Sequence, residues 1–412
     1  MQKDVYRDYR VIPLRDFPRA RIWAPRALVG EKLEPRENLL LTIERNRIVS
    51  LDTVAKGELP EEIVQSDTFF CLDRGATLLP SLIDAHVHLA LDGISFQEAV
   101  RKWESQEELR SKLEGDARSF LSCGIGMVRD GGDREAINLW FRDRVRRGGL
   151  QGPEVLAPGK ALYKAGSYGS FLGSGFSSSQ EIDYFLDEIS SRGIDLLKVL
   201  VSGIVSFRSY GRVGKSGIQS EELDYIVEQA RHRSLKVMAH ASSREAVNVA
   251  LDAGVDSIEH GYFLTRECLR KMASLGIAWV PTLIPVAAQV REGRKNFWAA
   301  EEIETISRTY QEQMEKLQLA EDTGVLLGMG TDSGAAGVEH GPALREEMML
   351  YSEAGLSNIK VLQAATSRNA RILGVEKLSG SLEAGMKPSL LEVKGKPLED
   401  LSSLSMVQRV FV

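Results

Sequence analysis

Apolar and polar residues follow two different patterns along this chain of 412 residues, and the pattern changes near residue 80. Before that point, short segments rich in β-forming residues are separated by Gly, Asn, Asp and Pro. Such segments are typical of antiparallel strands, which we predict within 21–30, 38–52 and 68–80. Residues 1–20 contain two prolines and scattered charges, and they favour no particular structure.

From Ser81 onward the chain repeats an apolar strand, a polar loop and an amphipathic helix. Strict alternation of this kind predicts a parallel sheet, and eight units predict a closed (β/α)8 barrel, a TIM barrel, although an open doubly wound sheet has a similar local pattern. Several predicted helices end at Gly, the usual residue after a helix C-terminus. The clearest helices are 221–234, 243–254 and 301–324, and the predicted strands are 82–89, 125–132, 154–162, 195–202, 236–242, 256–261, 278–284 and 325–334.

After the eighth unit the pattern returns to strands, in GSLEAGMKPSLLEVKG and SMVQRVFV. A chain that begins and ends in strands around a barrel is expected to complete its first sheet with its tail. We therefore predict that residues 1–78 and 379–412 together form a small composite β-sandwich domain. Residues 79–378 would form the barrel.

Composition narrows the range of partners. The net charge of −6 is mild, and no long run carries one sign, so neither nucleic acid nor an anionic membrane is an expected partner. The charged N-terminus does not resemble a secretory signal, and no segment matches a membrane helix, which favours a cytoplasmic protein. We expect a small-molecule substrate, and the sequence leaves a homo-oligomer open. The three cysteines are far apart and predict no disulfide framework.

Polar residues interrupt the predicted strands near their C-terminal ends, which converge on one face of a parallel barrel. His86 and His88 are two positions apart, so both side chains should point to the same side of a strand and could bind one ion. Imidazole nitrogens and a carboxylate, without a thiolate, suit a divalent metal such as Zn²⁺. The predicted metal-site residues are His86, His88, Lys198, His240, His260 and Asp332.

Lys198 is an unusual member of this set because an ammonium group has no lone pair. Burial beside metal ions lowers the pKa of a lysine, and the neutral amine can combine with CO2 to give a carbamate that bridges two ions. The alternative is that Lys198 reaches solvent or pairs with a carboxylate such as Asp195.

The motifs DAHVHL, LLKVLVS, VMAHAS, SIEHG and GTDSG occur in this order and resemble those of the amidohydrolase superfamily. The segment ATSRNARILGVEKLSGSLEAGMKPSLLEVKG is similar to its imidazolonepropionase-related and Xaa-Pro dipeptidase-like branch. The resemblance implies a barrel with a composite β-sandwich and a binuclear metal centre. In that centre, His86, His88 and Asp332 would hold the more buried ion, His240 and His260 the more exposed one, and carboxylated Lys198 would bridge them.

The resemblance also implies a hydrolase that cleaves an amide-type C–N bond in a dipeptide, an N-acyl amino acid or a cyclic amide. A metal-bridging hydroxide would attack the carbonyl, and Asp332 would act first as base and then as acid. Two alternatives stay open. One is a mononuclear deaminase or imidazolone-type hydrolase, and the other is a catalytically silent barrel that serves as a scaffold.

Loops near the strand ends should contact the substrate. We expect Tyr210 to do so, because a phenol can polarise a carbonyl without a fixed charge, while Arg208 and Arg212 could bind a carboxylate or simply face solvent. The Gly- and Ser-rich loop 163–179 could be a lid or a static loop. His340 is close enough in sequence to Asp332 to support it.

Overall fold

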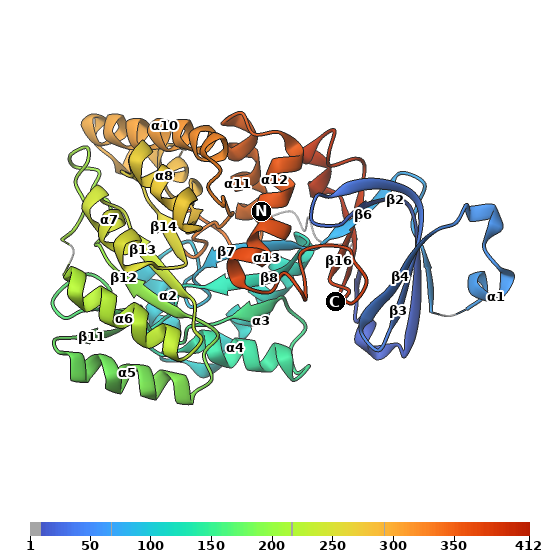
Figure 1. The fold of residues 1–412 in the computed structure, drawn as a ribbon, viewed down its shortest axis with the longest axis horizontal. Helices are drawn as coiled ribbons and strands as arrows, with labels where there is room; N and C mark the ends of the chain where they lie inside the picture. The colour runs from blue at the N-terminus through green and yellow to red at the C-terminus, as the bar shows by residue number, and fades with distance from the viewer. Residues whose placement is uncertain (1–9, 67, 216, 292) are drawn as a thin grey trace. The chain divides into compact units, whose positions relative to one another are not determined.

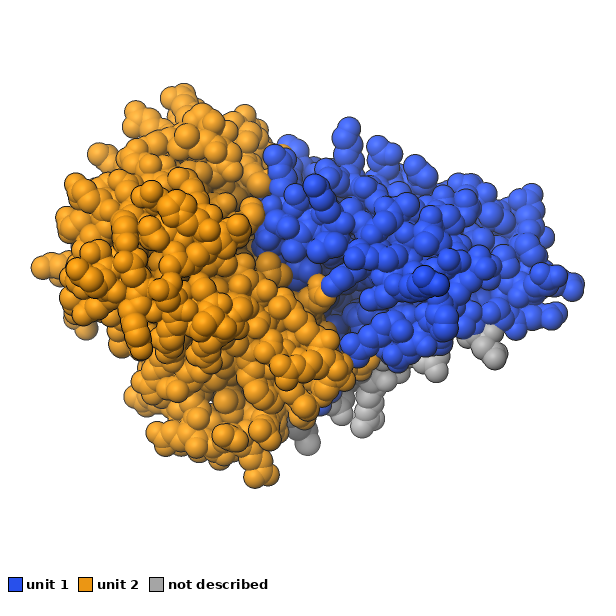
Figure 2. Space-filling view, turned by 60° about the horizontal axis from the view of Figure 1, so that its bottom comes forward, with its two compact units in different colours: residues 1–83, 118–127, 357–412 blue, residues 84–117, 128–356 orange. Residues whose placement is uncertain are grey.

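The computed structural model describes residues 10–66, 68–215, 217–291 and 293–412. The chain divides into two compact units, coloured separately in Figure 2. The first unit comprises residues 1–83, 118–127 and 357–412, and the second comprises 84–117 and 128–356. The sequence predicted no particular structure for residues 1–20, and of these, residues 1–9 lie outside the described part.

A sheet of eight strands dominates the first unit, and it contains strands from both ends of the chain. Its order is β1-β17-β16-β6-β2-β3-β4, with β5 paired to β2. The C-terminal β16 runs antiparallel to β6, and β17 runs parallel to β1. The strands predicted before residue 80 are confirmed, while the β-sandwich and its boundaries stay predictions. The bounds are β1 Arg10–Ile12, β2 Arg19–Val29, β3 Glu34–Glu44, β4 Arg47–Thr53, β5 Phe69–Cys71, β6 Ala76–Pro80, β16 Leu390–Lys394 and β17 Val407–Phe411.

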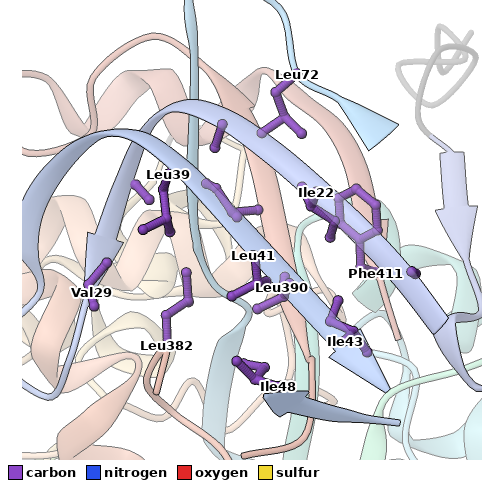
Figure 3. Packing of buried hydrophobic residues seen from close by; sticks show 14 of the residues in the cluster. Ile22, Val29, Leu39, Leu41, Ile43, Ile48, Leu72, Leu382, Leu390 and Phe411 are labelled. Carbon is purple, nitrogen blue, oxygen red and sulfur yellow. The ribbon is translucent and has the colours of Figure 1, made fainter. Parts of the chain in front are cut away.

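Alternation along the strands builds the core of this unit. Leu39, Leu41 and Ile43 occupy every second position of β3, point to one face and are fully buried. They pack in one cluster with Ile22 of β2 and Phe411 of β17, as Figure 3 shows. The two termini are therefore held together by apolar packing as well as by strand pairing.

The second unit contains parallel strands that alternate with helices along the chain (Figure 1). Six strands pair in the order β11-β10-β12-β13-β14-β15, and β7, β8 and β9 form a three-stranded sheet. The first residues of β7 and β8 belong to the first unit. Seven of the eight predicted strands are confirmed by these elements. The bounds are β7 Leu82–Val87, β8 Ile125–Asp130, β9 Glu154–Leu156, β10 Ala161–Lys164, β11 Gly173–Phe176, β12 Leu197–Leu200, β13 Val237–Ala241, β14 Ser257–His260 and β15 Ala278–Val280.

The Gly- and Ser-rich loop 163–179 contains a strand that sequence analysis missed. β11 pairs in parallel with β10, from Ala161 opposite Gly173 to Lys164 opposite Phe176. A side chain at Gly173 would place its Cβ 1.8 Å from the Ala161 carbonyl oxygen, so this close approach requires glycine. The same composition that suggested a loop therefore permits the pairing.

The predicted eighth strand, 325–334, does not form a regular strand. It makes isolated parallel bridges from Leu327 to Trp279 and from Ser333 to Val87, so it lies between β15 and β7. Gly330 sits where a Cβ would lie 2.7 Å from that of His86, and Asp332 has a left-handed φ of 55°. The close packing at Gly330 and the left-handed conformation of Asp332 prevent this segment from pairing as a continuous strand. A closed eight-stranded barrel stays a prediction.

Helices connect the strands, and Figure 1 shows α6, α7 and α8 beside β12, β13 and β14. Gly254, Gly276 and Gly324 end three helices in the left-handed conformation, as the sequence predicted. Among the described helices, none combines the length and apolar character that a membrane crossing requires. The bounds are α1 Glu61–Val64, α2 Phe96–Lys102, α3 Gln106–Ser122, α4 Ile137–Arg146, α5 Ser179–Ser191, α6 Ser220–His232, α7 Arg244–Ala253, α8 Arg266–Leu275, α9 Ile284–Ala287, α10 Ala300–Thr323, α11 Pro342–Glu353, α12 Asn358–Ala364 and α13 Ser367–Leu373.

Replacing Leu41 by Ala should lower the free energy of unfolding by about 2–5 kcal/mol, because the truncation leaves a cavity in a fully buried cluster. Urea denaturation followed by circular dichroism measures the change. Val49→Ala is the control, since Val49 is 45% exposed and its truncation should alter stability by less than about 0.5 kcal/mol. Equal losses for both variants would contradict the assignment of this core.

Candidate metal centre

The end of β7 and the segment after β15 bring three predicted ligands together. Nε2 of His88 lies 3.2 Å from Oδ1 of Asp332, and Nε2 of His86 lies 3.5 Å from the same oxygen. One ligand atom from each of the three residues lies within 4.8 Å of the others. This spacing is compatible with a shared metal ion.

The other three predicted residues come from neighbouring strands of the parallel sheet. Lys198 lies in β12, and its Nζ is 3.5 Å from Nε2 of His86. His240 in β13 and His260 at the end of β14 place their ring centroids 4.5 Å apart, and the His260 ring is 5.0 Å from that of His86. The structure therefore gathers all six predicted residues at one place.

The protonation states of this set suit metal binding. Burial lowers the pKa of His240 to about 4 and that of His260 to about 3, so both imidazoles are neutral at neutral pH and keep a lone pair. Burial by itself would raise the pKa of Asp332, but the hydrogen bond with His88 and the electrostatic interactions with the neighbouring imidazoles outweigh it and hold that pKa well below its usual range. The site combines neutral nitrogen donors with an anionic oxygen.

Lys198 is 1% exposed, and burial lowers its pKa to about 8 although the charges of Glu259 and Asp332 oppose the shift. The alternative that it reaches solvent or pairs with Asp195 is wrong. The oxygens of Asp195 instead accept hydrogen bonds from Arg142 at 3.0 Å and Arg146 at 2.8 Å. With this lowered pKa, a substantial fraction of the Lys198 side chains carries a neutral amine at mildly alkaline pH.

Glu259, which sequence analysis missed, orients His86. Its Oε2 lies 2.8 Å from Nδ1 of His86, and its Oε1 accepts from Arg129 at 2.8 Å and from Ser257 at 2.5 Å. Arg129 also donates to the carbonyl of Ala85 at 2.7 Å. With Nδ1–H donating to Glu259, the lone pair of His86 is on Nε2, which faces Asp332 and Lys198. The signal available in the sequence was an acidic residue, Glu259, directly before the predicted ligand His260.

Three further histidines have hydrogen-bond partners of their own. Nδ1 of His260 lies 2.7 Å from the Thr282 hydroxyl, and Nε2 of His240 lies 3.1 Å from the Gly203 carbonyl oxygen. His340 contacts the Ser333 hydroxyl at 2.8 Å, so it supports the residue after Asp332. Each contact fixes a ring orientation, as the ligands of metal sites require.

Backbone geometry at the site is unusual. His260, Thr282 and Asp332 adopt left-handed φ values of 67°, 48° and 55°. Such conformations cost on the order of 1 kcal/mol or more for residues with a side chain, and they cluster at functional sites. Gly131 makes room for His88, because a Cβ there would lie 2.4 Å from Cε1 of the imidazole.

A cavity of ≈ 180 Å³ lies against the cluster. Five of the six predicted residues, all except His86, line it together with Ser242. Tyr168, from the loop that follows β10, also lines it, with its ring centroid 6.0 Å from that of His240. The remaining lining residues are aromatic or aliphatic: Leu172, Leu200, Ile204, Val205, Phe207, Tyr262, Pro285 and Val286.

Tyr210, the predicted substrate contact, is not among the residues that line this cavity. Its hydroxyl donates to Glu312, and the Arg308 guanidinium lies 3.5 Å from the centre of its ring. The sequence indicated a phenol near the site but could not show which loop turns inward, and the structure has Tyr168 at the cavity instead.

The residues present fit a divalent cation. Neutral imidazole nitrogens and a carboxylate converge, which is the donor set that Zn²⁺ and similar ions prefer.

Replacing Glu259 by Gln should weaken metal binding by about 10-fold to 100-fold, because the amide neither holds the Nδ1 proton of His86 as firmly nor balances Arg129. Competition with a chromophoric chelator measures the affinity. Glu267→Gln, on the exposed side of α8, is the matched control. Unchanged affinity in Glu259→Gln would show that Glu259 does not orient a ligand.

The model of the amidohydrolase family matches residues 77–412. Ochratoxinase from Aspergillus niger is 24% identical over 399 residues, which cover 89% of this chain and 80% of that protein. An uncharacterized protein from Mycobacterium bovis is 26% identical over 323 residues, covering 76% of this chain and 78% of the relative.

Solved structures agree with this relationship. A Xaa-Pro dipeptidase with methionine bound in its active site is 26% identical and superposes with a TM-score of 0.81, over 94% of this chain and 97% of the other. The structure of A. niger ochratoxinase, 21% identical, has a TM-score of 0.80 over 95% of this chain and 94% of the other, and it shares the fold. Since the family model covers most of the sequence, including every predicted metal ligand, this chain belongs to the amidohydrolase family.

Proposed function

We propose that this protein is a binuclear metal-dependent amidohydrolase that cleaves an amide-type C–N bond in a small molecule. The observation that carries the proposal is the convergence of the six predicted ligand residues at one place, five of them lining one cavity, with neutral imidazoles and an ionised carboxylate. The class includes dipeptides, N-acyl amino acids and cyclic amides. Membership of the amidohydrolase family and relatives named ochratoxinase and Xaa-Pro dipeptidase support hydrolysis of this kind of bond.

Two divalent ions, most simply Zn²⁺, would occupy the site. His86, His88 and Asp332 would hold one ion, and His240 and His260 the other. Lys198 would add CO2 through its neutral amine, release a proton and become an anionic carbamate with an oxygen for each ion. Its burial and lowered pKa favour that reaction. Bound ions would supply a water of lowered pKa and would polarise the substrate carbonyl.

Asp332 would move the proton in this reaction. It is ionised at rest and faces the cavity, so it can accept a proton from the attacking water. The same carboxyl group can then deliver that proton to the leaving nitrogen, which must be protonated before the C–N bond breaks. One residue would thus serve as base and then as acid.

Tyr168 would donate a hydrogen bond to the carbonyl oxygen of the substrate. Burial raises the pKa of its phenol, so the hydroxyl keeps its proton throughout the working pH range. Its place at the cavity beside His240 supports this role, which the sequence had suggested for Tyr210. A neutral donor can stabilise negative charge on the oxygen as it develops in the transition state.

We also propose that the second unit closes into a (β/α)8 barrel, within residues 79–378. The isolated bridges from the segment 325–334 to both β15 and β7 support closure. The sheet of the first unit, with strands from both termini, supports a composite β-sandwich domain formed by 1–78 and 379–412.

Replacing Lys198 by Ala should reduce the metal content from about two ions per chain and lower kcat about 100-fold or more, because the bridging anion is lost. Metal analysis and steady-state kinetics on zinc-loaded protein measure both effects. Added short carboxylic acids should restore part of the activity, whereas Lys236→Ala, at the surface, should behave as the unmodified protein. Full turnover in Lys198→Ala without added acids would rule out the bridge.

Replacing Tyr168 by Phe should lower kcat about 100-fold with little change in metal content, because one donor to the developing oxyanion is removed. Tyr184→Phe is the control, since Tyr184 is 74% exposed. The same loss in Tyr210→Phe, with normal kinetics in Tyr168→Phe, would return the role to Tyr210.

A further inference from the structure

The cavity beside the metal-site residues contains almost no charge of its own. Among the residues that line it, the charged side chains are Lys198 and Asp332. Both belong to the predicted ligand set, and in the proposed function Lys198 becomes an anion. Its three lining histidines are the predicted ligands His88, His240 and His260.

The opposite walls are apolar. Leu172, Leu200 and Val286 are each no more than 4% exposed, and Phe207 lies beside them in the lining. The apolar surface continues outward through aromatic contacts, from Tyr168 to Phe171 at 5.7 Å between ring centroids and from Phe171 to Phe96 at 4.9 Å. Phe96 is 50% exposed, so this surface reaches solvent.

Four described basic residues from segments next to the lining are paired elsewhere or face solvent. Lys316 donates to the carbonyl of Tyr262 at 2.9 Å, and Lys164 pairs with Glu222. Arg208 and Arg212, which could have bound a carboxylate, are exposed and do not line the cavity. A carboxylate held against these walls, away from the ions of the proposed function, would lose its water without gaining a protein cation, and that loss is expensive in an apolar environment.

We propose that the substrate is an uncharged amide whose acyl or amine part is an aliphatic or aromatic group, with no carboxylate close to the scissile bond. This inference rests on the proposed function and narrows its substrate class. The apolar part packs against the wall formed by Leu200, Phe207 and Val286. Dipeptides and N-acyl amino acids, which carry a carboxylate near the amide, are poor substrates.

Three chromogenic anilides of similar size test the inference. Butyryl-4-nitroanilide is neutral, and succinyl-4-nitroanilide has a carboxylate in place of the terminal methyl group of the acyl chain. The butyryl amide of 5-amino-2-nitrobenzoic acid carries the carboxylate on the leaving group. With zinc-loaded protein, kcat/KM for the neutral anilide should exceed that of both acids by at least about 10-fold. An acid that reacts as well as the neutral compound overturns the inference while leaving the hydrolase standing.

A charge placed on the wall should reverse the preference. Ile204 lines the cavity and is 53% exposed, so Ile204→Arg adds a cation without burying it. This variant should raise kcat/KM for at least one acid relative to the neutral anilide by about 10-fold, while the uncharged Ile204→Met should not. Equal ratios in both variants, together with good turnover of the acids by the unmodified protein, would show that carboxylates are already accommodated.

Failure of the proposed function is separable from failure of this inference. If none of the three anilides is cleaved, hydrolysis of simple acyl anilides is refuted, and the affinities of the same compounds for the zinc-loaded protein are then measured by calorimetry. Binding of the neutral anilide at least about 10-fold tighter than the acids supports the inference. Equal or tighter binding of an acid overturns it.

Discussion

The geometry of the site depends on one buried carboxylate, Glu259, held between the guanidinium of Arg129 and the imidazole of His86. A buried charge is tolerated only when every partner is in place, and here both carboxylate oxygens are hydrogen-bonded and Arg129 is shared with Ser257 and a backbone carbonyl. These contacts tie β7, β8 and β14 together at the point where His86 meets Asp332. The orientation of the first predicted ligand is therefore a property of three strands.

The low polarity that makes this network costly also sets the chemistry of its neighbours. Burial keeps His240 and His260 neutral and lowers the pKa of Lys198. Their nitrogen lone pairs are therefore more available for binding than they would be in water. The same apolar surroundings provide the walls of the cavity. The proposed metal binding and the proposed preference for uncharged substrates would therefore both depend on the same apolar surroundings.

Periodic features were predictable from the sequence, and irregular ones were not. Strand and helix alternation revealed the element order, and the convergence of parallel strand ends was enough to gather His86, Lys198 and Asp332. The Gly-rich strand β11 was not predicted, because glycine has no conformational preference that would indicate strand pairing. The contact between Glu259 and Arg129 could not be predicted, because the two residues are 130 positions apart in the chain. The place of Tyr168 at the cavity, in contrast to Tyr210, could not be predicted because the direction of a loop depends on tertiary contacts.

The left-handed turns at His260, Thr282 and Asp332 have an evolutionary consequence. Glycine would relax the backbone at each of these positions, but it would also delete the imidazole, the hydroxyl that supports it or the carboxylate. Selection for stability would therefore favour glycine at these positions, whereas selection for catalysis favours the present side chains. Descendants that abandon catalysis should be recognisable by glycine at these turns, long before the surrounding scaffold changes.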